Sequence, residues 1–276
     1  EGYYENAKIN RVYVDRVHVK KAFAEYTAAY NADDPKIKLK IDHTYRVAAL
    51  CERIAKAAGM CAYDVELAWL SGMLHDVGRF EQIKRYNTFS DADSVDHAKF
   101  GADLLFKDGL ISTFLNGMVK CTGYKPGALE DRYSSDGVFL YDRLNKSDME
   151  MLELAIRCHN MYRIPQGLNR REQAFCNVLR DADKVDIFKV NIDTPLEEIY
   201  NTTTEELMKS DITDEVLEAF DEEHCILKAI RCTPADTVIG HVSLAYELVY
   251  DESVRITVEQ GYLAKLMHFH SDNEET

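Results

Sequence analysis

A histidine and an aspartate stand side by side where an apolar, helix-compatible run ends. The run covers residues 65–74, and the pair is His75-Asp76. Gly78 predicts that the helix stops there. Imidazole and carboxylate groups are both strong metal ligands. Neighbouring helical residues point about 100° apart, so the two side chains converge only on something between them, such as a metal ion. Taken alone, however, the dipeptide is better explained as a chance pair at a capped helix end.

Four more side chains of metal-ligating type fall on apolar helical faces. His43 is in step with the apolar residues 47, 50 and 54, which places it on the buried face of its helix. The same geometry recurs at His97, His159 and Asp183. A buried carboxylate is costly unless it is paired or ligates a metal, so Asp183 needs an explanation that a solvated face does not give. Together with His75-Asp76, these residues favour a metal site.

The chain has only five prolines and few alternating β-branched stretches, which predicts an all-helical fold. The helices of that fold must position the candidate ligands. The only strand-like patches are residues 12–14 and 17–19. Residues 80–93 and 123–137 are predicted to be loops. Before residue 191, helices are predicted over 16–30, 43–58, 64–77, 95–107, 111–121, 147–160 and 171–189.

Beyond residue 191 the composition shifts toward acid, and four amphipathic helices fit the pattern. They are predicted over residues 195–209, 213–230, 234–250 and 253–268. Since no flexible linker marks the boundary, we expect residues 191–276 to be a helical extension packed on a core of residues 1–190, the two forming one structural unit.

The bulk composition is that of an ordinary soluble globular protein, with 46% hydrophobic residues. A formal charge of −15 argues against binding of long nucleic acid, whose partners are basic. A small anionic substrate remains compatible with it, because a bound cation reverses the local field. No apolar run is long enough to span a membrane, and nothing resembles a signal peptide. The seven cysteines form no CxxC pair, which predicts buried free thiols and a cytoplasmic protein.

Five motifs, taken in order, resemble those of the HD-domain metal-dependent phosphohydrolase superfamily. The likeness runs from about residue 40 to 190 and implies an HD-type helical bundle. The motifs are Asp42-His43-Thr44-Tyr45-Arg46-Val47, Leu74-His75-Asp76-Val77-Gly78-Arg79, Asp96-His97-Ala98, Cys158-His159-Asn160 and Arg180-Asp181-Ala182-Asp183-Lys184.

The resemblance implies that one divalent metal is held by His43, His75, Asp76 and Asp183. In the binuclear branches of the superfamily, a second ion is held at the positions of His97 and His159, with Asp76 as the bridge. We favour two metals over one. The single-metal interpretation would leave His97 and His159 as substrate-contacting or supporting groups.

The sequence also departs from the family pattern. Arg79 stands where many relatives carry lysine. The compact ammonium is thus replaced by a planar guanidinium, whose paired N–H donors suit phosphate. His159 is followed by Asn160, and no Gly-Tyr-Pro tripeptide occurs. These features disfavour the cyclic-dinucleotide phosphodiesterase branch.

The ligand types indicate the chemistry. A divalent ion lowers the pKa of a bound water from 15.7 toward about 7, which makes hydroxide available at neutral pH. Two ions with Asp76 between them would hold that hydroxide in line with a phosphorus atom and neutralise the developing charge. Mixed histidine and carboxylate ligands suit Mn, Fe, Co, Ni or Zn better than Mg.

The predicted function is therefore hydrolysis of a phosphate ester or anhydride of a small, nucleotide-like molecule, with no long nucleic acid or membrane as a partner. Arg79, Arg163 and Lys184 are the candidate phosphate-binding residues. A homo-oligomer is compatible with the sequence. The histidines at 224, 241, 268 and 270 are interpreted as structural or exposed. Two alternatives stay open: a di-iron oxygenase, and a non-catalytic nucleotide-binding sensor on the same fold.

Overall fold

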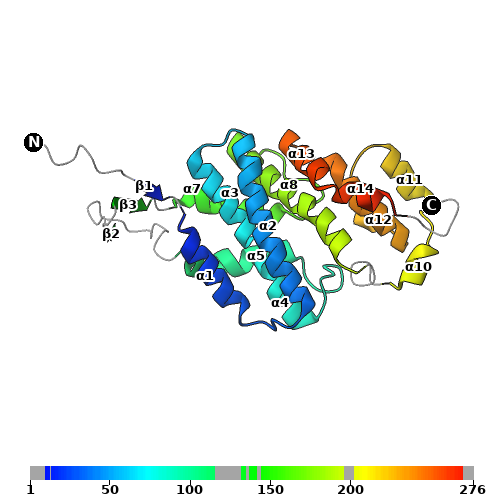
Figure 1. Ribbon diagram of the computed structural model, residues 1–276, viewed down its shortest axis with the longest axis horizontal. Coiled ribbons are helices and arrows are strands. Elements are labelled where there is room, and N and C mark those ends of the chain that lie inside the picture. Colours follow the sequence, from blue (N-terminus) through cyan, green and yellow to red (C-terminus); the bar gives the residue numbers. More distant parts are fainter. Residues whose placement is uncertain are drawn as a thin grey trace, which may run out of the picture.

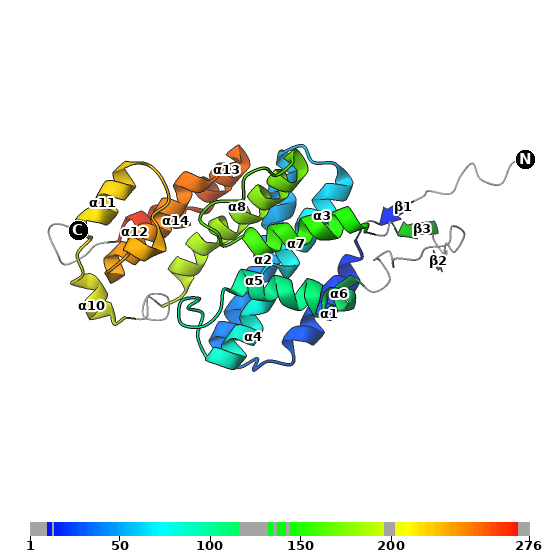
Figure 2. The ribbon, with the colours of Figure 1, turned by 180° about the vertical axis from the view of Figure 1, so that it is seen from behind.

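The protein is a helical bundle with one small sheet beside it in the computed structural model, which describes residues 10–12, 14–115, 132–134, 137–141, 144–195 and 202–269. The fold class predicted from the sequence is confirmed. Figures 1 and 2 show the core helices gathered around the antiparallel pair α2 and α3. These helices are α1 (Arg16–Thr27), α2 (Pro35–Ala57), α3 (Ala62–Leu74), α4 (Val77–Tyr86), α5 (His97–Ala102), α6 (Ile111–Leu115), α7 (Lys146–Cys158) and α8 (Arg170–Asp193). A π-helical turn, Asp103–Lys107, continues α5.

The C-terminal helices lie around the far half of α8, which runs out of the core toward them (Figure 1). The described helices are shorter than the predicted ones: the predicted spans 213–230, 234–250 and 253–268 are each divided, and residues 196–201 of the span 195–209 lie outside the described residues. One such break is Gly261, a left-handed residue (φ 70°) between the last two helices. The segment contains α10 (Thr204–Met208), α11 (Asp214–Asp221), α12 (Pro234–Val242), α13 (Asp251–Gln260), α14 (Tyr262–Met267) and two 3-10 turns, Lys228–Ile230 and Ser243–Glu247.

A small sheet lies beside the helical core, near the start of α1. It has the order β1-β3-β2, with β1 (Asn10–Val12) parallel and β2 (Arg132–Ser134) antiparallel to β3 (Gly137–Tyr141). The strand-like patch at residues 17–19 is instead part of α1. The predicted loop at 123–137 and the end of the predicted helix at 111–121 lie largely outside the described residues.

Local capping explains where the two longest helices begin. Asp34 accepts a hydrogen bond from the Lys36 amide, and Pro35 occupies the first turn of α2, where its missing N–H is not needed. Asn169 and Glu172 form a capping box at the start of α8. Helix α2 therefore starts eight residues earlier than predicted, and His43 lies within it rather than at its end.

The core is one large apolar cluster, and α8 joins it to a smaller one. Phe175 and Leu179 on α8 pack into the main cluster, whereas Phe188 belongs to the second, with residues of α10, α12 and α14. Two polar links add to this attachment: Asp181 accepts hydrogen bonds from the Val249 and Tyr250 amides, and Arg53 pairs with Glu252 and Glu259 of α13.

Two local predictions around the His75-Asp76 pair are wrong. Residues 80–86 of the predicted loop at 80–93 are helical: they belong to α4, whose apolar side is formed by Val77, Phe80 and Ile83. Gly78 lies inside α4 and does not end a helix, because α3 already stops at Leu74. Glycine is needed at residue 78 for close packing, since a Cβ there would fall 2.5 Å from the His97 carbonyl oxygen.

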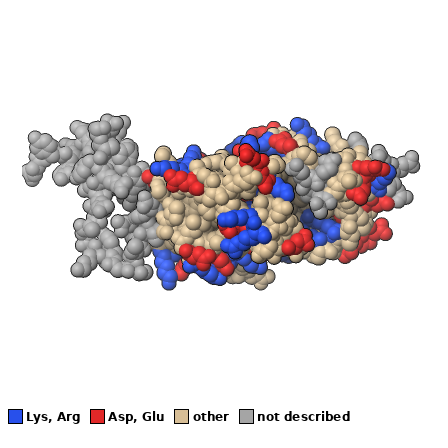
Figure 3. Space-filling model, turned by 90° about the horizontal axis from the view of Figure 1, so that it is seen from below, with Lys and Arg blue, Asp and Glu red and all other residues tan. Residues whose placement is uncertain are grey.

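Among the described residues no helix is long and apolar enough to cross a membrane. The six described cysteines are unpaired; Cys51, Cys158, Cys176 and Cys225 are buried, whereas Cys61 and Cys232 are exposed. On the face seen in Figure 3, acidic and basic side chains are interspersed over the described surface.

Candidate metal centre

The six predicted ligands are brought together from six helices or their ends. His43 and Asp183 come from the interiors of the long helices α2 and α8. The others stand at helix ends: His75 follows α3, Asp76 precedes α4, His97 opens α5, and His159 follows α7. The four histidines and Asp76 are each at most 4% exposed. Rigid helices thus fix every candidate ligand.

Asp76 lies at the centre of this group. It precedes α4 but makes no capping hydrogen bond to that helix; its carboxylate faces the histidines instead. One oxygen, Oδ2, is 3.5 Å from Nε2 of both His43 and His75. The other, Oδ1, is 3.5 Å from Nε2 of His97 and 3.7 Å from Nε2 of His159. Each oxygen therefore faces its own pair of histidines.

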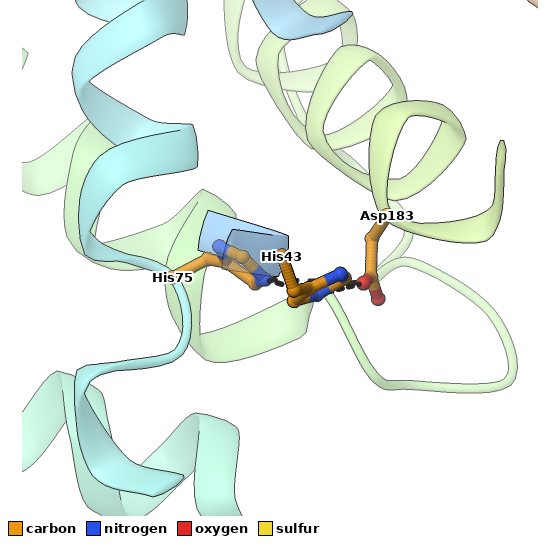
Figure 4. A group of neighbouring side chains, drawn as sticks. All are labelled: His43, His75 and Asp183. Atoms are coloured by element: carbon orange, nitrogen blue, oxygen red, sulfur yellow. Dashed lines mark hydrogen bonds and ion pairs between the residues drawn. The ribbon is translucent and has the colours of Figure 1, made fainter. Parts of the chain in front are cut away.

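Asp183 completes the first of these two groups. Its Oδ1 lies 3.2 Å from His43 Nε2 and 3.8 Å from His75 Nε2, and the two imidazole nitrogens are 3.3 Å apart. Figure 4 shows the three side chains pointing toward one another from α2, the end of α3, and α8. Ligands about 2.1 Å from one ion lie roughly 3 to 3.4 Å apart, so the donor spacing fits a divalent metal.

The second group consists of His97 and His159, whose Nε2 atoms are 3.1 Å apart. The donor atoms of His75, Asp76 and His159 also lie within 4.8 Å of one another. His75 therefore adjoins both groups, and its ring contacts those of His43 and His159.

Each imidazole is oriented through its Nδ1 atom. That atom contacts Asp186 Oδ2 in His43 (2.6 Å) and Asp91 Oδ2 in His97 (2.7 Å). The two others donate to backbone carbonyls, His75 to Gly72 and His159 to Ile156, each at 2.7 Å. A donor proton on Nδ1 leaves Nε2 with a lone pair, so all four rings present a metal-binding nitrogen inward.

Electrostatics keep most of these groups in the form that binds metal. Burial lowers the pKa of His75 to about 4 and that of His97, beside the Arg79 guanidinium, to about 3. Burial opposes ionisation of Asp76, yet the Lys40 ammonium and the neighbouring imidazoles hold its pKa well below the usual range. His43 differs: burial and Lys40 lower its pKa, but Asp183 and Asp186 outweigh them and raise it.

A cavity of about 570 Å³ opens onto the candidate ligands. Its wall includes Asp76, His97, His159 and Asp183, and it continues along α8 to the C-terminal segment. Seven lysines and arginines but only three acidic residues line it, in a chain whose formal charge is −15. The basic lining residues are Lys36, Lys40, Arg79, Arg180, Lys184, Lys228 and Arg231.

The three predicted phosphate-binding residues are placed differently. Arg79 lines the cavity, with its Nε 3.8 Å from Asp76 Oδ1 and without a hydrogen-bond partner. Lys184 also lines it; burial lowers its pKa to about 8, and its Nζ contacts the Glu247 carbonyl. Arg163 lines a separate hollow formed by residues 163–168 and neighbouring side chains.

A family model described as the HD domain matches residues 41–188, more than half of the chain. The chain belongs to the HD-domain family. The predicted family is therefore confirmed, and HD domains are in general metal-dependent phosphohydrolases. Searches of curated proteins and of solved structures gave no match. The His and Asp groups of this HD domain could hold divalent metal.

Several polar residues at the site were not predicted from the sequence. Lys40 Nζ lies 2.7 Å from Asp76 Oδ2, and Asp186 and Asp91 orient His43 and His97. Lys40 precedes His43 by three residues, and Asp186 follows Asp183 by three, so helical spacing places each on the same face as a ligand. His241, interpreted as structural or exposed, lines the cavity.

Proposed function

We propose that this HD-domain protein is a phosphohydrolase with two divalent metal ions that cleaves an ester or anhydride of a small, nucleotide-like substrate. The position of the Asp76 carboxylate is the observation that supports it best. Its two oxygens face two different histidine pairs, as a bridging ligand requires. In this proposal His43, His75 and Asp183 hold one ion, His97 and His159 hold the other, and Asp76 joins them.

Bound divalent ions would supply a water of lowered pKa and positive charge beside the phosphoryl oxygens. The chain's own residues set the geometry. Asp76 fixes the spacing of the two ligand groups, and the Nδ1 partners of the four histidines prevent ring rotation. Arg79 Nε, buried without a hydrogen-bond partner beside Asp76, is placed to donate to a phosphoryl oxygen.

The charge of the cavity supports an anionic substrate. Basic residues exceed acidic ones on its wall, and two of its three acidic residues, Asp76 and Asp183, are proposed metal ligands. Low-dielectric walls of one sign concentrate counter-ions of the other. A volume of about 570 Å³ is in the range of small-molecule sites, which agrees with a nucleotide-sized ligand and not with a polymer.

The ligand types favour Mn, Fe, Co, Ni or Zn over Mg, which prefers all-oxygen coordination. Elemental analysis of the purified protein should therefore find close to two such ions per chain. A panel of nucleotides and phosphoesters, assayed for phosphate release with that metal restored, then identifies the substrate.

The decisive variant is Asp76→Ala. This variant should no longer bind metal, and its rate of phosphate release should fall at least about a hundredfold. Its helical circular dichroism should be unchanged. Asp193→Ala, an exposed acidic residue on α8, is the matched control and should keep both properties. Activity that survives the loss of metal would refute the proposal. Oxygen uptake without phosphate release would favour a di-iron oxygenase, and tight nucleotide binding without turnover under any divalent metal would favour a sensor.

A further inference from the structure

The C-terminal segment, outside the matched HD domain, contributes a wall of the cavity. Residues 225–229, Arg231, His241, Leu244 and Glu247 line the same cavity as Asp76 and Asp183. A molecule bound at the candidate metal centre therefore extends toward residues that no HD-domain motif includes. Two of those residues are cations, Lys228 and Arg231.

Lys228 lines the same cavity as the candidate ligands Asp76 and Asp183. It begins the 3-10 turn Lys228–Ile230, and its side chain has no hydrogen bond or ion pair with the described residues. Burial lowers its pKa, and the charges that act on it include Asp91 and Asp183. The Lys228 side chain is thus a cation at the cavity wall without an acidic partner among the described residues.

Arg231 is a fixed cation without a carboxylate partner among the described residues. Its Nη2 donates to the Ile226 carbonyl at 2.6 Å and to the Gly240 carbonyl at 3.3 Å, while its Nε is buried without a hydrogen bond. Other half-buried arginines pair with acidic side chains: Arg16, Arg46, Arg157 and Arg171 each do so. A guanidinium held in place but left unneutralised suits an anionic ligand.

The position of the Arg231 guanidinium depends on the absence of a side chain at residue 240, which is glycine. A Cβ at Gly240 would lie 2.2 Å from Arg231 Nε and 2.3 Å from Cζ. Glycine in the interior of a helix lowers its stability relative to alanine, so Gly240 in α12 is explained by the room it gives the guanidinium.

The cavity wall also includes apolar side chains, among them Leu39, Ile187, Val190, Ile226 and Leu244. The cavity thus offers the candidate metal ligands, apolar surface and a second group of cations from the C-terminal segment.

We propose that the cavity recognises a substrate with two anionic ends: a scissile phosphoryl group at the metal centre, and a second oxyanion, phosphate or carboxylate, held by Lys228 and Arg231. This rests on the proposed phosphohydrolase function. It assigns substrate selection to the C-terminal segment, and the phosphoryl chemistry to the HD domain.

The test compares binding of matched probes to the metal-loaded, full-length protein by calorimetry. Alkane-diol bisphosphates of three to eight carbons are compared with ω-phosphooxy-carboxylates and with simple alkyl phosphates of the same lengths. The two-ended probes should bind at least about tenfold more tightly at the best length, as expected for one charge-assisted hydrogen bond. Whichever oxyanion gives the larger gain identifies the second group.

Lys228→Met should remove most of that gain and leave binding of the alkyl phosphate unchanged. Gly240→Ala should also reduce it, because it displaces the guanidinium while keeping its charge. Lys209→Met is the control and should behave as wild type, because Lys209 is an exposed lysine that follows α10 and pairs with Glu205. Equal affinity for one-ended and two-ended probes at every length overturns the inference, as does a gain that survives both Lys228→Met and Gly240→Ala.

Turnover is measured separately, so that the two proposals fail in different ways. If the alkyl phosphates are hydrolysed but the second anion gives no gain, only the two-ended substrate is refuted. If no probe is hydrolysed although the two-ended probes bind more tightly, the phosphohydrolase function is refuted and the second anion site stands.

Discussion

His43 Nδ1 lies 2.6 Å from Oδ2 of Asp186, one turn of α8 beyond the candidate ligand Asp183. Asp186 is buried and also accepts two hydrogen bonds from Arg46. Its negative charge raises the basicity of the imidazole and fixes its orientation. At the other histidine pair, Asp91 does the same for His97. Each ligand group therefore has its own supporting carboxylate.

This arrangement predicts that the two supporting carboxylates affect different metals. Asp186→Asn should weaken one metal equivalent by about 10- to 100-fold, because the group around Asp76 Oδ2 loses the orientation of His43. Asp91→Asn should weaken the other equivalent by a similar factor, through His97. Chelator competition with elemental analysis measures both.

Under limiting metal, each single variant should retain about one ion per chain where the wild type retains two, whereas Asp193→Asn should match the wild type. Loss of both ions in either variant, or of neither, would contradict two separable sites.

Sequence reasoning identified the residues that the structure gathers, but not all that surround them. The six candidate ligands were recognisable because each lies in a short motif on a regular helix. Helix α4 was missed because Arg79, Glu81, Gln82 and Lys84 conceal its apolar residues at 77, 80 and 83. The predicted helix end at Gly78 was wrong, because glycine is required there for close contact with α5, which no local sequence pattern shows. Lys228 and Arg231 approach the centre through packing across α8, which no local pattern encodes.

Lys40 would compete with a metal ion for one oxygen of Asp76. Its ammonium lies 2.7 Å from Asp76 Oδ2, the oxygen that also faces His43 and His75. Lys40→Met should therefore bind metal about tenfold more tightly, the size expected for removing one like charge at this range. Since Lys40 also lines the cavity, the variant should lose a phosphate contact, and kcat/KM should fall.

Lys38→Met provides the matched control, because Lys38 lies on the same helix but is exposed and paired with Asp42. Metal titration of the chelator-treated proteins measures the affinity, and steady-state assays measure kcat/KM. Unchanged or weaker metal binding in Lys40→Met would show that the ammonium does not oppose the ion.

The stability of the metal-free protein should fall as the pH drops from about 6.5 toward 4. Burial lowers the pKa of His75 to about 4 and that of His97 and His241 to about 3. An unfolded histidine has a pKa of about 6.5. Between about pH 6.5 and 4 the unfolded chain therefore binds protons that the folded chain does not bind. Each such group removes up to about 1.4 kcal/mol of unfolding free energy per pH unit. His43, whose pKa is raised, acts in the opposite sense.

Urea unfolding at pH 7.5, 6.5, 5.5 and 4.5, in the presence of a chelator, measures this dependence. His241→Gln should reduce the slope by about the contribution of one group, because it removes one buried histidine without touching a candidate ligand. A stability that is flat or rises over this pH range would contradict the burial of these imidazoles as neutral groups.

Gly78→Ala should destabilise the fold and the second ligand group together. The added Cβ would lie 2.5 Å from the His97 carbonyl oxygen, 2.7 Å from the Gly101 amide nitrogen and 2.9 Å from its Cα. All three are backbone atoms, so α4 and α5 must separate at an expected cost of about 1 to 3 kcal/mol of unfolding free energy. Because His97 opens α5, its ring should move away from Asp76 and one metal equivalent should weaken.

Gly101→Ala, on the opposite side of the same helix contact, is the milder variant with which Gly78→Ala is compared. Its nearest contact, the Gly78 amide nitrogen, is at 3.0 Å, so it should destabilise less and shift His97 less. Urea unfolding and metal titration of both variants measure the two effects. If Gly78→Ala is as stable as the wild type and retains both metal equivalents, close packing of α4 on α5 does not position His97.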